Sequence, residues 1–227
     1  MIIITGASRG IGKYLFDYYR EKGEVVYGTY NHSQPEISSD SNFCKVDISN
    51  FQDVQNWIEN IDKGLGEIKL LNCAGINYNS FAHKADIGEW IKVINVNLIG
   101  TFNVIRCVLP TMRKQKFGRI INFSSVVAQR GIPGTSAYAA SKAALWGLTK
   151  SIAVENANKG ITINNINLGY TELGMIQEVP EKYLDGLKSS IPIGDLIPSQ
   201  DIINVVEYLM KSKYSTGSNV DLNGGFI

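Results

Sequence analysis

The sequence predicts a doubly wound α/β fold, in which a parallel sheet of about seven strands carries helices on both faces. Short apolar runs recur along the chain, helix-period segments lie between most of them, and a glycine-rich stretch follows the first run. Strands that alternate with helices form right-handed crossovers. Such crossovers make the strands parallel and cover both faces of the sheet.

The first strand is expected at Ile2–Thr5, a continuous apolar run of the kind that is buried on both faces of a parallel sheet. Further strands are predicted at Val25–Thr29, Phe43–Val46, Ile68–Asn72, Arg119–Phe123, Ile161–Asn167 and Asn219–Leu222. Helices are predicted at residues 10–22, 50–62, 86–113, 136–158 and 199–212. We find no internal repeat and no linker between two cores, so residues 1–227 are interpreted as a single domain.

Two stretches lack a strong periodic pattern. Residues 31–42 are polar and turn-forming, so we expect a loop there instead of a crossover helix. Residues 168–198 contain three prolines around a weakly helical segment at 181–189. Because this stretch follows the sixth strand, we interpret it as a mobile lid on the substrate side.

The composition excludes several classes of protein. The chain has 227 residues, of which 44% are hydrophobic and 19% charged, as in ordinary soluble proteins. Its 22 Lys and Arg nearly balance 21 Asp and Glu, so no overall positive field attracts nucleic acid or an anionic membrane. Cys44, Cys73 and Cys107 have no zinc-site spacing and are an odd number, which favours a reducing compartment and no metal. No apolar run approaches about 20 residues and no signal peptide is evident, so we expect a cytoplasmic protein.

A glycine-rich segment stands where the first strand turns into the first helix. Glycine permits the tight turn and lets the backbone approach a pyrophosphate, while the helix N-terminus contributes unpaired N–H groups. Three glycines alone are also compatible with a simple tight turn, but their position after the first strand favours a dinucleotide site. The residues assigned to this cradle are Gly6, Ser8, Arg9, Gly10, Ile11 and Gly12.

The end of the second strand indicates which dinucleotide binds. NAD-binding sheets usually place an acidic residue there, about 20 residues after the glycines, to hold the adenosine ribose. This chain has no acid between Tyr27 and Glu36, so a 2′-phosphate meets no repulsion. Arg9 and the polar side chains of Ser8, Asn31 and Ser33 are suited to hold that phosphate, which favours NADP over NAD.

Three side chains around the fifth strand predict carbonyl chemistry. Ser125 follows that strand, and Tyr138 and Lys142 share one face of the next helix at positions i and i+4. A free phenol has a pKa of about 10, and a neighbouring ammonium and a positive nicotinamide ring both favour its anion. Tyr138 is therefore the expected acid/base, with Ser125 bonded to the carbonyl oxygen and Lys142 on the nicotinamide ribose. Such a Tyr/Lys pair alone is usually a surface pair; the serine and the cradle favour catalysis.

These motifs resemble those of the short-chain dehydrogenase/reductase family, which has a Rossmann fold, and the resemblance covers essentially the whole chain. Thr5–Gly12 matches the family's TGxxxGxG loop, and Asn72–Gly75 matches its NNAG motif. Asp47–Ile48 is similar to the pair that contacts adenine. Asn95–Leu98 is similar to the segment that carries the helix asparagine, which implies that Asn97 helps to hold a water in a proton relay. The framework is most similar to NADP-dependent 3-oxoacyl-carrier-protein reductases.

The sequence also departs from the family pattern. Cys73 replaces the second asparagine of NNAG, Leu168 replaces the proline before Gly169, and Leu173 stands where a threonine often touches the carboxamide. We expect Thr171 to substitute for that threonine. Beyond the cradle, the residues expected to bind the cofactor are Asn31, Asp47, Ile48, Asn72, Cys73, Ala74, Gly75, Tyr138, Lys142, Gly169 and Thr171.

The predicted function is NADP(H)-dependent interconversion of a ketone and a secondary alcohol, with an unassigned small-molecule substrate. A sugar-nucleotide epimerase or dehydratase would normally show another glycine spacing and a larger C-terminal domain. A non-catalytic NADP sensor would lack catalytic residues, whereas all four are present, namely Asn97, Ser125, Tyr138 and Lys142.

The resemblance also implies self-association. The helices at 86–113 and 136–158 are long and apolar enough to pair with copies of themselves, and the family commonly forms dimers or tetramers through them. We therefore expect a homodimer or homotetramer. Trp57, Trp90 and Trp146 are interpreted as packing residues, with a subunit contact as the alternative for Trp146.

Overall fold

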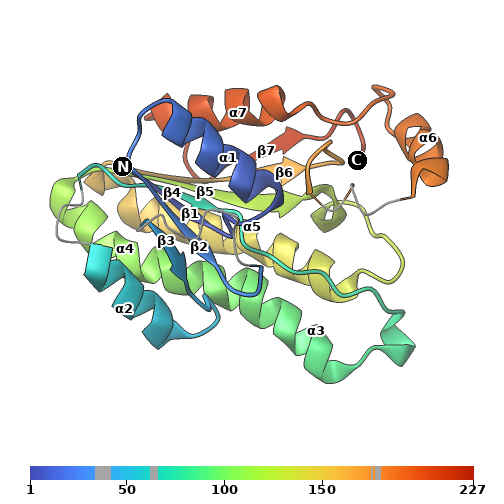
Figure 1. The fold of residues 1–227 in the computed structure, drawn as a ribbon, viewed down its shortest axis with the longest axis horizontal. Helices are drawn as coiled ribbons and strands as arrows, with labels where there is room; N and C mark the ends of the chain where they lie inside the picture. The colour runs from blue at the N-terminus through green and yellow to red at the C-terminus, as the bar shows by residue number, and fades with distance from the viewer. Residues whose placement is uncertain (34–41, 62–65, 175, 177–179) are drawn as a thin grey trace.

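The computed structural model describes residues 1–33, 42–61, 66–174, 176 and 180–227. Within them, seven parallel strands form one sheet in the order β3-β2-β1-β4-β5-β6-β7 (Figure 1). The strands are β1 (Ile2–Thr5), β2 (Val26–Tyr30), β3 (Phe43–Lys45), β4 (Lys69–Asn72), β5 (Gly118–Ser125), β6 (Ile161–Leu168) and β7 (Asn219–Leu222). The predicted parallel sheet is confirmed, and all seven strands lie where the sequence places them.

Helices cover both faces of this sheet (Figure 1). On one face lie α1 (Gly10–Glu21) and α7 (Ser199–Lys211), and on the other lie α2 (Phe51–Ile61), α4 (Thr101–Gln115) and α5 (Ser136–Asn156). The remaining helices are α3 (Ile87–Ile94), α6 (Glu181–Ser190) and the short turns η2 (Ala82–Lys84), η4 (Val126–Ala128) and η5 (Ala157–Lys159). The doubly wound arrangement predicted from the alternating pattern is therefore confirmed.

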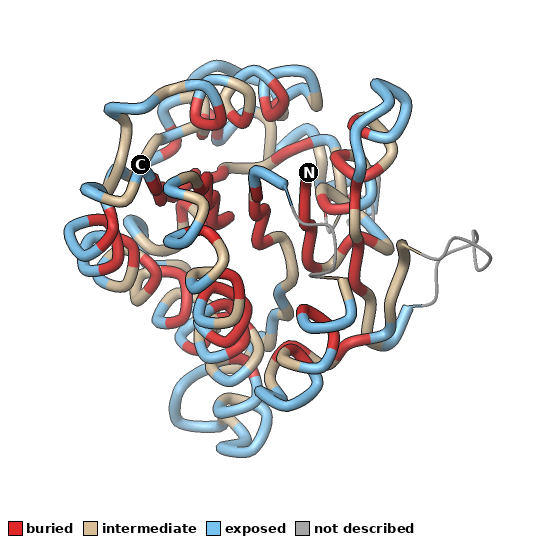
Figure 2. The backbone as a smooth tube through the Cα atoms, turned by 90° about the vertical axis from the view of Figure 1, so that its left-hand side faces the viewer, coloured by how far each residue is buried: buried red, intermediate tan, exposed pale blue. Residues whose placement is uncertain are grey.

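Two apolar layers lie on the two faces of the sheet. Successive side chains of β1 alternate, so Ile2 and Ile4 pack toward α1 and α7, while Ile3 packs toward α2, α4 and α5. All three are fully buried. Burial of one such side chain stabilises the fold by about 1.5–3 kcal/mol. Figure 2 shows the same division, with the central strands buried and the helices exposed on their outer sides.

The long helix predicted at 86–113 contains an irregularity that its sequence period does not reveal. α3 runs into α4 through a π-helical turn, η3 (Asn95–Gly100). The side chain of Asp86 caps the start of α3 by accepting a hydrogen bond from the Glu89 N–H at 2.9 Å. The π-helical turn matters for function because Asn97 lies in it.

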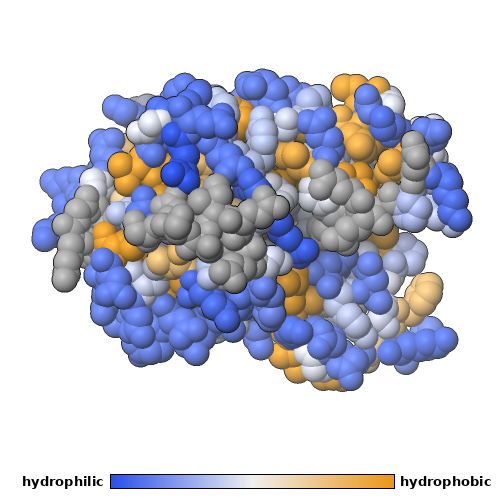
Figure 3. All heavy atoms as spheres, in the orientation of Figure 1, coloured by the Kyte–Doolittle hydropathy of each residue, from blue (hydrophilic) through white to orange (hydrophobic). Residues whose placement is uncertain are grey.

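The combined helix Ile87–Gln115 is, by length and composition, the one candidate membrane span within the described residues. This corrects the expectation that no apolar segment reaches that length. The buried core helix of a globular protein passes the same test, and Val104, Ile105 and Val108 of this helix are fully buried against the sheet. Figure 3 shows a mainly hydrophilic face on which hydrophobic residues form separate patches.

The two irregular stretches are only partly described. Residues 34–41, which include Glu36, lie outside the described residues, and so do 62–65, 175 and 177–179. The weak helix predicted at 181–189 is confirmed as α6. The two ends of the stretch after β6 are joined to each other, because Thr171 and Ile197 form a parallel β-bridge.

Candidate active site

The candidate site lies at the carboxyl edge of the sheet, where β1, β4 and β5 end side by side. Register pairs join Thr5 to Asn72 and Asn72 to Asn122, so the segments that follow these strands leave the sheet at the same edge. Open α/β sheets bind their ligands at this edge, outside the ends of the strands. The cradle, the NNAG-like segment and the catalytic residues are thereby brought together.

The glycine positions Gly6 and Gly12 of the cradle have no room for side chains. Gly6 has a φ of +65°, which favours glycine, and its N–H donates to Thr29 Oγ1 at 3.2 Å. The Ala7 N–H donates to the Thr29 carbonyl at 2.8 Å, which fastens the loop to the end of β2. A Cβ atom added to Gly12 would lie 2.2 Å from the Gly6 oxygen. The glycines therefore permit the tight turn that joins β1 to α1.

The start of α1 suits an anion. Arg9 occupies the N-cap position in an extended conformation and its side chain makes no capping hydrogen bond, so the first N–H groups of the helix stay available. The first turn carries no acidic residue in the described helix, so the positive end of its dipole is not neutralised there. Arg9 is exposed and Ser8 is half-buried beside it. These residues fit the phosphates of a dinucleotide.

The segment after β6 passes over this cradle. A Cβ added to Gly10 would lie 3.2 Å from the Gly174 Cα, so the two backbones approach closely. Thr171 is buried, and its Oγ1 accepts a hydrogen bond from the Leu173 N–H at 3.3 Å. Gly169 lies against the C-terminal segment, where its Cβ would meet the Asn223 Cα at 2.9 Å. The structure thus places Gly169 and Thr171 at the root of the predicted lid.

Not all residues predicted to touch adenosine point into the site. Ile48 is buried in the core, against Gly100, which leaves its backbone as the part that can face a ligand. Asp47 Oδ1 accepts from the N–H and the hydroxyl of Ser49 at 3.0 and 2.7 Å. Asn31 is half-buried just after β2.

In the NNAG-like segment, too, some of the polar groups bond to the protein itself. Asn72 is buried and its Nδ2 donates to Asn122 Oδ1 at 2.8 Å, so this part of its side chain is engaged within the sheet. The Ala74 N–H donates to Thr5 Oγ1 at 3.2 Å, which ties the segment to β1. Burial raises the pKa of the Cys73 thiol strongly, and the positive charge of Lys142 only partly opposes this. The thiol therefore stays protonated and unreactive.

The end of β5 holds α5 through three consecutive residues. The Phe123 carbonyl accepts from Lys142 Nζ at 2.6 Å, and the Ser124 hydroxyl donates to the Lys142 carbonyl at 3.0 Å. The Ser125 side chain lies beside the Tyr138 hydroxyl and acts as the hydrogen-bonding group that lowers its pKa. Lys142 Nζ lies 5.5 Å from the centre of the Tyr138 ring. The structure thus brings together Ser125, Tyr138 and Lys142, as the sequence predicts.

The ionisation of this pair corrects one expectation. Burial raises the pKa of Tyr138 to about 12, and the hydrogen bond from Ser125 is what opposes the rise. We expected the ammonium of Lys142 and a positive nicotinamide ring to favour the phenolate; burial of the phenol acts in the opposite direction and is the larger effect. Burial also lowers the pKa of Lys142 itself to about 8, and Cys73 acts in the opposite direction. Without a cofactor charge the phenol is therefore a proton donor at neutral pH.

Asn97 connects the π-helical turn to the active site. Its Oδ1 accepts from the Ile76 N–H at 2.8 Å and its Nδ2 donates to the Ile76 carbonyl at 2.9 Å. Nδ2 also donates to Ser141 Oγ at 3.1 Å, and Ser141 lies next to Lys142 on α5. A Cβ on Gly75 would lie 3.3 Å from Asn97 Oδ1 and 3.5 Å from Lys142 Nζ, so these groups are neighbours.

Sequence reasoning missed several polar residues behind the site. Trp146 was assigned to packing, yet its Nε1 donates to Ser124 Oγ at 3.1 Å and to Asn167 Oδ1 at 3.0 Å. Trp90 likewise donates to Ser136 Oγ at 3.2 Å, whereas the packing assignment is correct for buried Trp57. The polar residues Asn165 and Asn167 inside an apolar strand were the available signal, because a buried amide needs partners.

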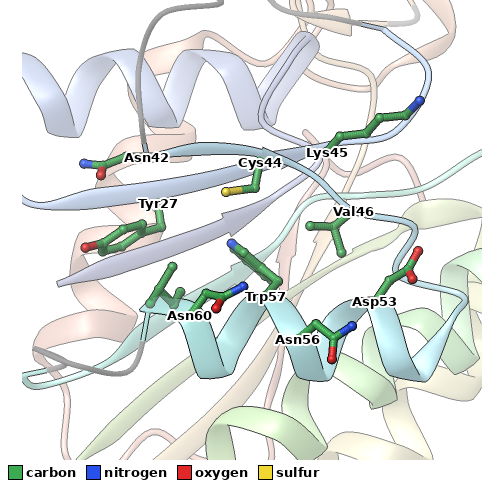
Figure 4. Close-up of a pocket in the computed structure, with 10 residues that line it drawn as sticks. Tyr27, Asn42, Cys44, Lys45, Val46, Asp53, Asn56, Trp57 and Asn60 are labelled. Carbon is green, nitrogen blue, oxygen red and sulfur yellow. The ribbon is translucent and has the colours of Figure 1, made fainter.

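A large cavity of the described residues lies away from this site. A groove of about 790 Å³ lies at the sheet edge between β2, β3 and α2, with Tyr27, Cys44 and Trp57 among its lining residues (Figure 4). It is distant in the sheet order from β5 and contains none of the catalytic residues. The chemistry of the residues, and not cavity size, locates the active site.

Comparisons with known proteins agree with this geometry. The family model described as short chain dehydrogenase matches residues 1–184. The chain belongs to the short-chain dehydrogenase/reductase family. This membership makes it an oxidoreductase of C=O and CH–OH groups that uses a nicotinamide cofactor.

Relatives in the short-chain dehydrogenase/reductase family align over nearly the whole chain. An acetoacetyl-CoA reductase of Shinella zoogloeoides is 35% identical over 98% of this chain and 96% of its own length. A 3-oxoacyl-acyl-carrier-protein reductase of Staphylococcus aureus is 34% identical over the same shares. A solved structure, the ligand-free aldohexose dehydrogenase of Thermoplasma acidophilum, superposes with a TM-score of 0.91 and 28% identity, covering 99% of this chain and 92% of that one.

Proposed function

We propose that this protein catalyses the NADP(H)-dependent interconversion of a ketone and a secondary alcohol, with Tyr138 as the acid/base. The observation that carries the proposal is the junction of β5 and α5. There, the Ser125 side chain lies beside the Tyr138 hydroxyl, and Lys142 is held one helical turn from the phenol. These groups meet at the sheet edge where the glycine cradle also ends.

In ketone reduction, a bound nicotinamide supplies the hydride to the carbonyl carbon. The Tyr138 hydroxyl gives its proton to the carbonyl oxygen, where negative charge develops. The Ser125 hydroxyl donates a hydrogen bond to the same oxygen. The raised pKa of Tyr138 keeps this donor protonated at neutral pH. In the reverse direction, Tyr138 takes the proton of the alcohol.

Lys142 and Asn97 support the proton transfer. The ammonium of Lys142, held by the Phe123 carbonyl, stabilises negative charge on the phenol after it has given up its proton. Lys142 would also hold the nicotinamide ribose. Asn97 fixes the segment at Ile76 beside Lys142 and contributes to the path that returns a proton to the site.

The residues of the cradle fit NADP(H). The N–H groups at the start of α1 would hold the pyrophosphate, and Arg9 with Ser8 and Asn31 would hold the 2′-phosphate. The NNAG-like segment and Thr171 would face the nicotinamide side. No carboxylate of the described residues 27–33 stands at the end of β2, which favours NADP over NAD.

We propose a 3-oxoacyl thioester as the substrate. Its support is the pair of relatives at 34–35% identity that are named acetoacetyl-CoA reductase and 3-oxoacyl-acyl-carrier-protein reductase. A sugar substrate is the second candidate, because the structural neighbour is named aldohexose dehydrogenase. The residues at 168–198 would act as the lid over either substrate, and we propose a cytoplasmic homodimer or homotetramer.

The proposal is tested with purified protein, NADPH or NADH, and matched substrates. We expect NADPH oxidation with acetoacetyl-CoA, little turnover with an aldohexose and NADP, and preference for NADPH over NADH. Tyr138→Phe should lower kcat by about 10²–10⁴-fold while NADPH binding persists. Turnover by the Phe variant at the wild-type rate would refute the role of Tyr138. If the protein turned over the aldohexose but not acetoacetyl-CoA, a sugar would be the substrate instead of a 3-oxoacyl thioester.

A further inference from the structure

A row of polar side chains lies directly behind the active site. Ser124 of β5 is the register partner of Asn167 of β6, which is in turn the partner of Asp221 of β7. Register partners in adjacent strands project toward the same face of the sheet. Ser124 and Asn167 are buried, whereas Asp221 is exposed at the strand edge. The proposed proton transfer uses none of these side chains.

Trp146 connects this row to α5. Its Nε1 donates to both Ser124 Oγ and Asn167 Oδ1, at 3.1 and 3.0 Å. Ser124 Oγ in turn donates to the Lys142 carbonyl at 3.0 Å. One turn of α5, from Lys142 to Trp146, is therefore fixed to the sheet by its backbone at one end and its side chain at the other.

The hydrogen bonds of the row permit one arrangement. The Asp221 carboxylate only accepts, and its Oδ1 receives hydrogen bonds from Asn167 Nδ2 at 2.8 Å and Gln129 Nε2 at 3.0 Å. This orients the Asn167 amide so that its oxygen faces Trp146. A reversed amide would place an N–H donor against the Trp146 donor and another acceptor against the carboxylate. The exposed carboxylate thus determines the orientation of a buried amide.

The fixed part of α5 also carries the catalytic groups. Tyr138, Lys142 and Trp146 follow one another at intervals of four residues, so they share one helix face. Sliding or rotation of that face would move the Tyr138 hydroxyl from Ser125 and Lys142 Nζ from the Phe123 carbonyl. Displacement of a reacting group by about 1 Å can lower a rate by about 10²-fold.

We propose that Trp146, Asn167 and Asp221 are positioning residues, which form a latch from β7 to α5 and hold Tyr138 and Lys142 in register with the end of β5. The inference deepens the proposed function and rests on it. Trp146 acts through Ser124 and Asn167, and none of the three latch residues touches the reacting atoms.

Trp146→Phe tests the latch, because it keeps the aromatic ring and removes the N–H donor. We expect kcat for ketone reduction to fall about tenfold, with the KM for NADPH within about twofold of wild type. For alcohol oxidation, the midpoint of the pH profile should rise by about half a pH unit, because Tyr138 loses part of the Ser125 hydrogen bond that favours its anion. The other titratable groups beside Ser125 and Tyr138 are Lys142 and Cys73.

Trp57→Phe is the matched control. Trp57 likewise lies in a helix that covers the sheet and is buried there. Its Nε1 has no oxygen or nitrogen acceptor among the described residues, and the Cys44 sulfur is its polar neighbour. This variant should keep the wild-type kcat and pH profile. An equal loss in Trp57→Phe, or an unshifted profile in Trp146→Phe, would overturn the latch.

Asp221 provides a second test at an exposed position. Asp221→Leu removes the acceptor and should show the same fall in kcat as Trp146→Phe. Asp221→Asn retains a carbonyl oxygen as an acceptor and should keep most of the wild-type kcat. Equal losses in the two variants would contradict the latch, even if Trp146→Phe failed to fold. Tyr138→Phe in the same assay separates the failure of the latch from the failure of the proposed function. If Tyr138→Phe retained activity, the proposed function would fail. If Tyr138→Phe lost activity and the latch variants did not, only the latch would fail.

Discussion

The two halves of the sheet, β4 to β7 and β1 to β3, differ in the side-chain contacts that hold their strands together. In β4 to β7, Asn72, Asn122, Asn165 and Asn219 form one register row across four strands. Hydrogen bonds link them, from Asn72 to Asn122 at 2.8 Å and from Asn165 to Asn219 at 2.7 Å, with Thr149 of α5 between the two pairs. In β1 and β2 the buried side chains are mainly apolar, and β3 has three residues.

This difference matches what each half does. Proton and hydride transfer require side chains held in a fixed geometry, and directional hydrogen bonds between strands and α5 provide it. The phosphate cradle in the other half needs a tight turn, which depends on the absence of side chains at Gly6 and Gly12. The catalytic half therefore depends on polar contacts between side chains, whereas the cofactor-binding half depends on glycine positions without side chains.

The largest effect is expected for Gly12→Ala in the cradle. The new Cβ would lie 2.2 Å from the Gly6 carbonyl oxygen, a backbone atom that cannot move away without opening the turn. We expect NADPH binding, measured by fluorescence titration, to weaken by about 100-fold or more. Gly186→Ala in α6 is the control, because its Cβ meets nothing within 4 Å. Unchanged affinity in Gly12→Ala would remove the spatial explanation of the cradle.

Asn122→Leu tests the polar half. The change removes the acceptor of the Asn72 amide and the donor to the Thr149 hydroxyl, which keeps only its hydrogen bond to Asn165. Urea denaturation should show a free energy of unfolding lower by about 1–3 kcal/mol. Asn204→Leu, which alters an exposed amide of α7, should change it by about 0.5 kcal/mol or less. Similar values for the two variants would mean that the buried amides do not hold this half together.

Arg9→Ala sharpens the assignment of the cofactor. The loss of one charged hydrogen-bonding partner of the 2′-phosphate should raise the Kd of NADPH by about tenfold and leave that of NADH within about twofold. Lys13→Ala is the control, because Lys13 lies one turn further along α1 and pairs with Asp17. If both dinucleotides weakened equally in Arg9→Ala, Arg9 would not read the 2′-phosphate.

The smallest effect is a change in rate with pH. Lys142, with a pKa of about 8, is charged below that value and neutral above it, whereas Tyr138, at about 12, keeps its proton throughout. The kcat for reduction should therefore be constant from about pH 6 to 7 and fall above about pH 8, because the neutral amine no longer stabilises the phenolate. A rise through pH 8 would contradict the role of the ammonium.

Much of this molecule follows from its sequence pattern. Continuous apolar runs locate the strands, and the spacing from Tyr138 to Lys142 places both groups on one helix face because the period of a helix is fixed. The π-helical turn at Asn95–Gly100 is not predicted, because the apolar pattern indicates a helix without showing which of its turns has i→i+5 hydrogen bonds. The latch depends on cross-strand register, which pairs Ser124 with Asn167 only after the sheet has formed.

The ionisation of Tyr138 also lies beyond the sequence. Proximity in the chain to Lys142 favoured a lowered pKa, whereas the folded environment buries the phenol and raises the pKa to about 12. The sign of such a shift depends on how much water the fold removes from the group. The lid at 168–198 and the pairing of subunits stay predictions.

Isotope effects on a single turnover test most directly whether Tyr138 donates its proton as hydride arrives. Wild-type protein is mixed with acetoacetyl-CoA and NADPH, with and without deuterium at the transferred position, in H₂O and in D₂O. Both substitutions should slow the same step, and the solvent effect should vanish in Tyr138→Phe along with most of the rate. A solvent effect that persisted unchanged in Tyr138→Phe would show that another group supplies the proton.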